Sequence, residues 1–248
     1  MAGRVRTLSW RSQNSPSTPT KNHEEVTGQS VRESDEKTEL PTRVLAVGSL
    51  KTPSLYLHCT QANETGKYIA LSHCWGTDQE QLPLQTTPDK LEAYKRRIDP
   101  NELPRTFLDA VTVAREIDVQ YLWIDSLCII QGDDNDWKKE SQKMEQVFSL
   151  AYCTISATCA KNSHEGFLTF PVKEAVRIPD GEISQFAVCA YTADKSFKQA
   201  VEDGVLNKRG WVLQERALSR RTIHFTGLQI FWECGSVIRY DNLTQLAR

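Results

Sequence analysis

The chain has 248 residues, a mass of 28.2 kDa, a formal net charge of -2 and a pI near 6.2. This length suits one substantial α/β domain whose core needs no disulfides or metals, and the balanced charge argues against a nucleic-acid surface, which needs clustered Lys and Arg. Because the seven cysteines are dispersed without a Cys-x-x-Cys pair, and no apolar stretch resembles a membrane span or signal peptide, we expect a cytoplasmic protein with reduced thiols.

The first part of the chain is polar. Residues 1–40 are rich in Ser, Thr, Glu, Lys and Asn, so they cannot bury enough apolar surface to offset the entropy of ordering, and we expect a disordered tail. The folded domain then covers residues 41–248. Its first two alternating runs, Arg43–Val47 and Ser54–His58, are typical of edge strands or a hairpin.

The next strand-like run ends in side chains that can bind a ligand or take part in catalysis. It begins at Tyr68, and its apolar residues give way to Ser72, His73, Cys74 and Trp75. In open α/β sheets, ligands lie in the crevice outside the carboxyl ends of the strands. This cluster therefore indicates a pocket lining.

A polar segment and a helix follow. Residues 77–104 carry several prolines and one helical piece, about Asp89–Arg97, which is consistent with a mobile lid. From Pro104 the apolar residues recur at helical spacing as far as Ile117. This helix should pack on the sheet and lead into the following strand.

That following strand, Tyr121–Asp125, also ends in polar side chains. Asp125 and Ser126 come at its end, and Cys128 follows shortly after. Since the carboxyl ends of parallel strands meet at one edge of a sheet, we expect these residues to share a crevice with the first cluster.

A helix predicted from about Trp137 to Ala151 places a carboxylate on its apolar face. Glu140 lies three residues after Trp137, on the inward side. A buried carboxylate needs a partner or a solvated pocket. Two interpretations stay open: a structural ion pair with an arginine such as Arg105 or Arg216, or a functional position in a pocket.

The remaining elements complete an α/β fold. Strands are predicted at Tyr152–Thr158 and Phe186–Tyr191, a short helix at Arg209–Arg216, and a C-terminal β-hairpin within residues 221–234. We expect a mainly parallel central sheet with flanking helices, followed by this hairpin.

Three residues of the predicted helix Arg209–Arg216 share a side. Trp211, Gln214 and Glu215 recur at helical spacing. They form either a face docked on the sheet or part of a pocket, with a flanking arginine available for a phosphate or carboxylate contact.

Several long blocks, in the same order, resemble the heterokaryon incompatibility (HET) domain. The blocks are Ala70-Leu-Ser-His-Cys-Trp-Gly76, Leu103–Phe107, Tyr121–Gln131, Asp136-Trp137 with Glu140 and Met144, and Arg209–Arg216. They place the core of the domain at about residues 68–216. The resemblance implies a fungal allorecognition protein, part of an innate immunity system, that triggers programmed cell death when incompatible hyphae fuse.

HET domains are also distantly similar to Toll/interleukin-receptor (TIR) domains, which are flavodoxin-like and in some cases cleave NAD. Because those enzymes use a Glu on a helix shortly after a Trp, the resemblance implies NAD hydrolysis, with NAD as substrate and no tightly bound cofactor. The catalytic residues would be Glu140 and Asp125. The substrate contacts would be Ser72, His73, Trp75, Ser126, Cys128, Trp137, Trp211, Gln214 and Glu215.

Two other functions remain open at this point. The first is a non-enzymatic signalling module that assembles with itself or with a separate sensor protein. The second is a thiol hydrolase in which His73 activates Cys74 or Cys128 and Asp125 orients the imidazole. A metal site is not expected, because the available ligand types, His58-Cys59 and His73-Cys74, lack the spacing that gathers four ligands around one ion.

Overall fold

A computed structural model of the chain describes residues 37–76, 82–168, 196–227, 229–235, 237–240 and 245–246, all within one compact unit, Asp35–Arg248. The strands are β1 (Thr38–Glu39), β2 (Arg43–Gly48), β3 (Pro53–Cys59), β4 (Thr65–Gly66), β5 (Tyr68–Ser72), β6 (Tyr121–Trp123), β7 (Cys153–Ser156), β8 (Arg221–Phe225), β9 (Ile230–Cys234), β10 (Val237–Tyr240) and β11 (Gln245–Leu246). The helices are α1 (Leu91–Arg96), η3 (Pro100–Glu102), α2 (Arg105–Glu116), α3 (Asp125–Cys128), α4 (Asp134–Ser141), α5 (Met144–Leu150), η4 (Lys198–Glu202), η5 (Leu206–Lys208) and α6 (Gly210–Leu218).

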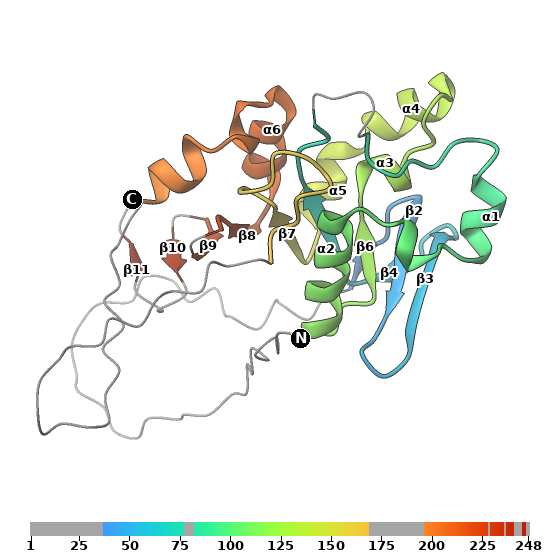
Figure 1. The fold of residues 1–248 in the computed structure, drawn as a ribbon. Helices are drawn as coiled ribbons and strands as arrows, with labels where there is room; N and C mark the ends of the chain where they lie inside the picture. Colours follow the sequence, from blue (N-terminus) through green and yellow to red (C-terminus); the bar gives the residue numbers. More distant parts are fainter. Residues whose placement is uncertain are drawn as a thin grey trace, which may run out of the picture. The chain divides into compact units, whose positions relative to one another are not determined.

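One mixed sheet organises the described residues, in the order β11-β10-β9-β8-β7-β5-β6-β2-β3 (Figure 1). Its central strands β8, β7, β5 and β6 run parallel, which confirms a parallel centre. The pairings on both sides are antiparallel. The prediction of a mainly parallel sheet is therefore wrong in extent. The short connections β2–β3 and β8–β9–β10 can join only antiparallel neighbours, and β2 also runs antiparallel to β6, which is distant in the chain.

Both predicted hairpins are present. Strand β2 pairs with β3 in antiparallel register, and β8 pairs with β9 in the same way. Gly227 lies between β8 and β9 with a φ of 77°, a conformation that glycine adopts without steric cost. The C-terminal hairpin continues into β10, which makes it the start of a longer antiparallel meander.

The core lies around the parallel strands. Every residue of β5 and β7 is buried, as expected where both faces of a parallel sheet are covered. Helix α2 contributes Phe107, Ala110, Val111 and Ala114 to this core and contacts β2 and β6. The helix predicted from Pro104 is thereby confirmed, with its apolar stripe turned toward the sheet.

The helix predicted over residues 137–151 is interrupted. It forms α4 and α5, with the break at Gln142 and Lys143. Lys143 donates its backbone N–H to the carbonyl of Glu140, and its ammonium group donates to Thr42 Oγ1 at 2.7 Å. This tertiary contact fixes a turn that the helical pattern of the sequence does not contain.

The ordered part of the chain begins a few residues earlier than predicted. Strand β1 pairs with β4 and Leu40 is buried, so ordered structure already begins inside the predicted tail. Residues 1–36, the predicted strand Phe186–Tyr191 and residues 77–81 of the predicted lid lie outside the described residues. Helix α1 confirms the helical piece of the lid segment. No helix in the described ranges is long and apolar enough to cross a membrane.

Candidate functional site

Two neighbouring strand ends meet at one edge of the sheet, as the sequence predicted. Strands β5 and β6 are parallel and paired, and Asp125 begins α3 just after β6. The indole Nε1 of Trp75 donates to Asp125 Oδ2 at 2.8 Å. His73 Nδ1 lies 4.0 Å from Asp125 Oδ1. The residues that follow the two strands therefore form one constellation.

Helix α6 brings two more charged residues to this edge. Ser72 Oγ donates to Glu215 Oε2 at 2.5 Å, and the guanidinium of Arg209 donates to the backbone carbonyl of His73. Glu215 is buried on the same side of α6 as Val212. Figure 1 shows α3 and α6 at the same end of the sheet. We call the set Ser72, His73, Trp75, Asp125, Arg209 and Glu215 the strand-end cluster.

The carboxyl group of Glu215 is the most perturbed acid of the strand-end cluster. Burial raises its pKa to about 7, and the negative charge of Asp125 raises it further, while the Ser72 hydrogen bond and Arg209 act in the opposite direction. A carboxyl group with this pKa exchanges protons near neutral pH. Such groups are common where acid–base chemistry takes place.

Asp125 has a different environment. Its side chain accepts hydrogen bonds from the Trp75 indole and from the backbone N–H of Ser126, the latter at 2.7 Å. It is only partly buried, at 24% side-chain exposure. The strand-end cluster thus contains two carboxyl groups in contrasting surroundings.

His73 is held as a neutral imidazole inside the protein. Its side chain is buried and packs edge-on against Phe107 at 5.0 Å between ring centroids. Burial lowers the pKa of His73, and Asp125 opposes this effect only in part. Its Nε2 atom has no hydrogen-bond partner among the described residues.

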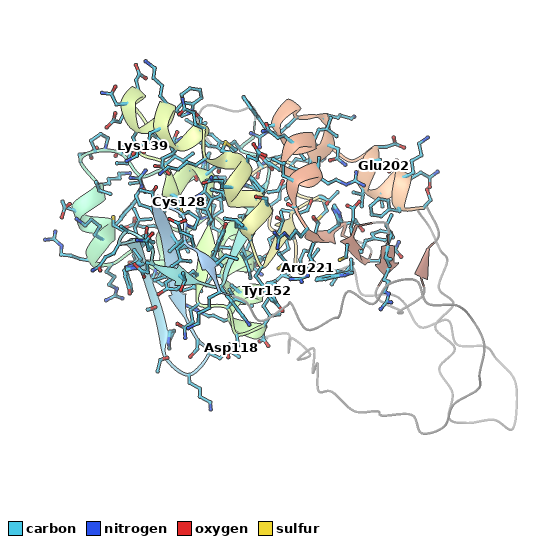
Figure 2. All side chains as sticks on the ribbon, turned by 180° about the vertical axis from the view of Figure 1, so that it is seen from behind. Asp118, Cys128, Lys139, Tyr152, Glu202 and Arg221 are labelled. Carbon is cyan, nitrogen blue, oxygen red and sulfur yellow. The ribbon has the colours of Figure 1, made fainter. Side chains whose placement is uncertain are left out.

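The cysteines near the cluster are buried thiols. Cys74 packs with Leu206 and Val212, and burial raises its pKa. Burial also raises the pKa of Cys128 to about 12, and Figure 2 labels this residue inside the folded unit. A thiolate is the reactive form of cysteine, so both environments disfavour a thiol hydrolase.

Glu140, predicted as catalytic, is placed in a different setting. It is buried, as its inward position on the helix predicted, and its carboxylate lies 3.3 Å from Lys143 Nζ. The suggested arginine partners were wrong, because Arg105 pairs with Asp109 and Arg216 with Glu233. No hydrogen bond or ion pair described for Glu140 joins it to the strand-end cluster.

The other predicted substrate contacts are distributed between interior and surface. Ser126 is buried and donates to the carbonyl of Leu84 at 2.9 Å. Trp137 on α4 is half exposed, and Trp211 on α6 is exposed. Gln214 is also exposed, so it does not share the buried side of α6 with Glu215.

No group of three or more His, Cys, Asp or Glu side chains that could hold a metal ion is found in the part of the chain that the structure describes. Of the four ligand residues considered from the sequence, His73 and Cys74 are buried, and His58 instead places Nε2 2.7 Å from Glu64 Oε1. Cys59 beside it is exposed.

A second polar group next to the cluster was missed by the sequence analysis. His224 Nε2 lies 2.9 Å from Glu233 Oε2, and Arg216 binds both oxygens of that carboxylate at 2.8 and 3.1 Å. A signal was present in the alternation of Thr222 and His224 along β8, which puts both side chains on one face of the sheet. The sequence does not tell which helix covers that face, so the partners of His224 could not be predicted.

Comparison with known families agrees with the motifs. A family model described as Heterokaryon incompatibility protein (HET) matches residues 68–215, more than half of the 248-residue chain. No curated protein and no solved structure gives a match. The matched segment starts at the first residue of β5 and ends at Glu215, so it contains the whole strand-end cluster. The chain therefore belongs to the heterokaryon incompatibility (HET) family.

Proposed function

We propose that this HET protein is a cell-death effector of fungal allorecognition that hydrolyses NAD in the cytoplasm at the strand-end cluster. Family membership supports the role in heterokaryon incompatibility. The observation that carries the enzymatic part is the pairing of a buried acid, Glu215, with a second carboxylate, Asp125, at the carboxyl edge of parallel strands. Ligands of open α/β sheets bind at this edge.

The proposed reaction breaks the bond between nicotinamide and ribose. The bonding electrons leave with the pyridinium nitrogen of NAD, so nicotinamide departs neutral and needs no proton. Positive charge develops on the ribose, and a carboxylate such as Asp125 stabilises it. Water then bonds to the ribose carbon and gives up its proton to Glu215. A base with a pKa of about 7 suits this transfer at neutral pH.

The other members of the cluster have supporting roles in this proposal. Trp75 orients the Asp125 carboxylate through its indole N–H, and Ser72 orients Glu215 through its hydroxyl. Arg209 supplies the positive charge of the cluster, and its guanidinium suits the pyrophosphate of NAD. The exposed ring of Trp211 is available for stacking.

Glu140 is the competing catalytic candidate, since it follows Trp137 in the order found in NAD-cleaving TIR domains. Its ion pair with Lys143 supports a structural role instead. The parallel centre of the sheet supports a distant relation to the flavodoxin-like TIR domains.

The test is the release of nicotinamide and ADP-ribose from NAD by the purified protein at high concentration. We expect Glu215→Gln to lower the rate by about 100-fold or more, because it removes a general base. Glu140→Gln, the same chemical change on α4, should retain activity if the variant folds. Absence of release by folded wild-type protein would overturn the proposal, and loss of release only in Glu140→Gln would move the catalytic role to that residue.

One observation favours a second function, self-assembly or binding of a sensor protein. Trp211 and Leu213 on α6 are 61% and 70% exposed, so this helix presents two large apolar side chains that a partner could cover. If cell killing persists in Glu215→Gln but is lost in Trp211→Ser, the assembly function is supported over catalysis.

A further inference from the structure

A layer of polar side chains lies between α6 and the sheet. Ser72, Ser156 and His224 occupy paired positions on the parallel strands β5, β7 and β8, and all are buried. Thr154 and Thr222 form the next pair on the same face, two residues earlier. Burying polar groups costs free energy unless each finds a partner. Ser156 and Thr154 find partners in Thr158 and Ser219, whereas His224 Nδ1 has none among the described residues and needs an explanation.

A small cavity opens within this layer. The polar residues of both rows line it, and Val212 and Arg216 of α6 and Asn207 of η5 complete its wall. Its volume is about 10 Å³. This is near the minimum needed for one water molecule and too small for a metabolite. The occupant that fits is a single water with several polar partners.

His224 supplies an unpaired acceptor at the cavity. The Glu233 carboxylate, bound by Arg216, can only accept, so the His224 Nε2 at 2.9 Å carries the proton and donates. Nδ1 is then an acceptor, and it is buried without a hydrogen-bond partner among the described residues. Burial, followed by the positive charge of Arg216, lowers the pKa of His224 to about 3, which keeps the ring neutral.

Ser72 supplies a second acceptor on the other side of the cavity. Its hydroxyl proton is donated to Glu215 Oε2 at 2.5 Å, so the oxygen of Ser72 has lone pairs left to accept. A water molecule has two protons to donate. One suits His224 Nδ1 and the other suits Ser72 Oγ, while the Thr222 hydroxyl can donate to the water oxygen. The hydroxyl of Thr154 cannot, because it donates to Ser219 Oγ, whose own proton goes to the backbone carbonyl of Glu215.

We propose that the cavity holds one ordered water molecule that bridges His224 Nδ1 and Ser72 Oγ, and that His224 acts through this water as a positioning residue for Glu215. The bridge polarises the Ser72 hydroxyl and so strengthens its hydrogen bond to the ionised carboxylate. The catalytic meaning of this water rests on the proposed function, whereas its presence and its effect on Glu215 do not.

Charge effects can be separated from this hydrogen-bond path. The other charged side chains at its two ends are Asp125 and Arg209 beside Glu215, and Glu233, Arg216 and Glu202 beside His224. Figure 2 labels Glu202 on η4. Because His224 is neutral, His224→Phe leaves every one of these charges in place. A change at Glu215 in that variant therefore reports the hydrogen-bond path.

The first experiment is a high-resolution crystal structure of the wild-type protein. We expect one ordered water within about 3.2 Å of both His224 Nδ1 and Ser72 Oγ. A cavity without density for a water, or a protein group bound directly to Nδ1, would overturn the proposal. This result decides the question even if no variant folds.

The second experiment is an NMR titration of the Glu215 carboxyl carbon in wild type, His224→Phe and Phe197→Leu. Phe197 packs edge-on against His224 at 5.6 Å, so the control loosens the same region but keeps Nδ1. We expect His224→Phe to raise the pKa of Glu215 by about 0.5 and the control to leave it unchanged. An unchanged value in His224→Phe, or equal changes in both variants, would refute the positioning role. Neither experiment uses NAD, so an inactive protein would leave this test intact.

Discussion

Glu215 and Asp125 lie at the same edge of the sheet although they are ninety residues apart in the chain, and they differ in burial. Glu215 is buried, whereas Asp125 keeps about a quarter of its side chain exposed. Desolvation therefore raises the pKa of Glu215 to about 7. At the scale of single residues, the folded state holds a carboxyl group in an environment that opposes its ionisation.

This burial has a consequence for stability that can be measured. The pKa of Glu215 lies above its ordinary value of 4.5, so the folded state favours the protonated form. The contribution of Glu215 is fully present below about pH 4.5 and is lost as the pH rises through 7. We expect Glu215→Gln, which is always neutral, to be more stable than wild type at pH 8, by up to about 3 kcal/mol.

Urea unfolding of both proteins at pH 5 and pH 8 checks this prediction. At pH 5 the difference between them should shrink to about 1 kcal/mol or less, because unfolded Glu215 is already partly ionised there. The lowered pKa of His224 adds an opposite trend, because its contribution is lost as the pH falls from 6.5 toward about 3. Both proteins contain His224, so this trend cancels in the difference between their free energies of unfolding. Equal stability of the two proteins at pH 8 would contradict a buried, perturbed Glu215.

Trp75 offers a second test at the residue scale. Trp75→Phe keeps an aromatic ring but removes the indole donor to Asp125. Hydrogen bonds to charged groups contribute about 1.5 to 3 kcal/mol, so we expect the free energy of unfolding to fall by about 1 to 2 kcal/mol and nicotinamide release to fall about 10-fold. Trp211→Phe is the matched control, since that ring is exposed, and its effect should stay below about 0.5 kcal/mol. Equal effects in both variants would exclude a special role for the indole of Trp75.

Part of the strand-end cluster could be predicted from the sequence because strand ends can be recognised locally. Ser72, His73, Trp75 and Asp125 each follow an apolar run, and parallel strands place such ends together. Glu140 illustrates the limit of this reasoning. Helical spacing predicted its burial correctly and also places Lys143, three residues later, beside it. The break after α4 and the contact of Lys143 with Thr42 depend on tertiary structure, which spacing does not encode.

At the scale of elements, α6 determines what the sheet edge can do. It closes over the ends of β5, β7 and β8 and brings Arg209, Glu215 and Arg216 to them. The helix itself was predictable from residues 209–216, but its docking was not, since Trp211 and Gln214 turn out to be exposed. An apolar stripe gives the buried face of a helix only when one face is clearly more apolar than the others. Helix α6 has large side chains on several sides.

The turn between β2 and β3 provides a test of element geometry. Gly48 has a φ of 67°, and a Cβ added there would lie 2.3 Å from the backbone oxygen of Thr52. Gly132, before α4, has a φ of 83° but nothing within 4 Å of the added Cβ. We expect Gly132→Ala to cost about 1 to 2 kcal/mol of stability, from backbone conformation alone.

Gly48→Ala should cost clearly more than Gly132→Ala, by about 1 kcal/mol or more, because the clash with backbone adds to the same conformational penalty. Thermal or urea unfolding of the two variants measures the difference. Equal losses would show that the hairpin relaxes around the added methyl group and that its backbone is not fixed as described.

At the scale of the whole domain, the α/β class was predictable and the composition of the sheet was not. The buried runs of β5, β6 and β7 indicate parallel strands, which is correct for the centre. In the antiparallel flanks, β3 and β9 alternate between more and less buried residues, as antiparallel strands commonly do. Strand β2 is buried along most of its length like the parallel strands, so its pattern does not reveal its antiparallel pairing. The HET match runs from β5 to α6, so it covers the segments that bring the strand-end cluster together.

In the proposed function, cell death follows from NAD cleavage at Glu215. The most direct measurement is the cellular NAD concentration in a fungal host after induced expression of wild type or Glu215→Gln at equal protein levels. We predict that NAD falls before viability does with wild type, and that neither falls with Glu215→Gln. Death of wild-type-expressing cells at an unchanged NAD concentration would show that killing does not proceed through NAD cleavage.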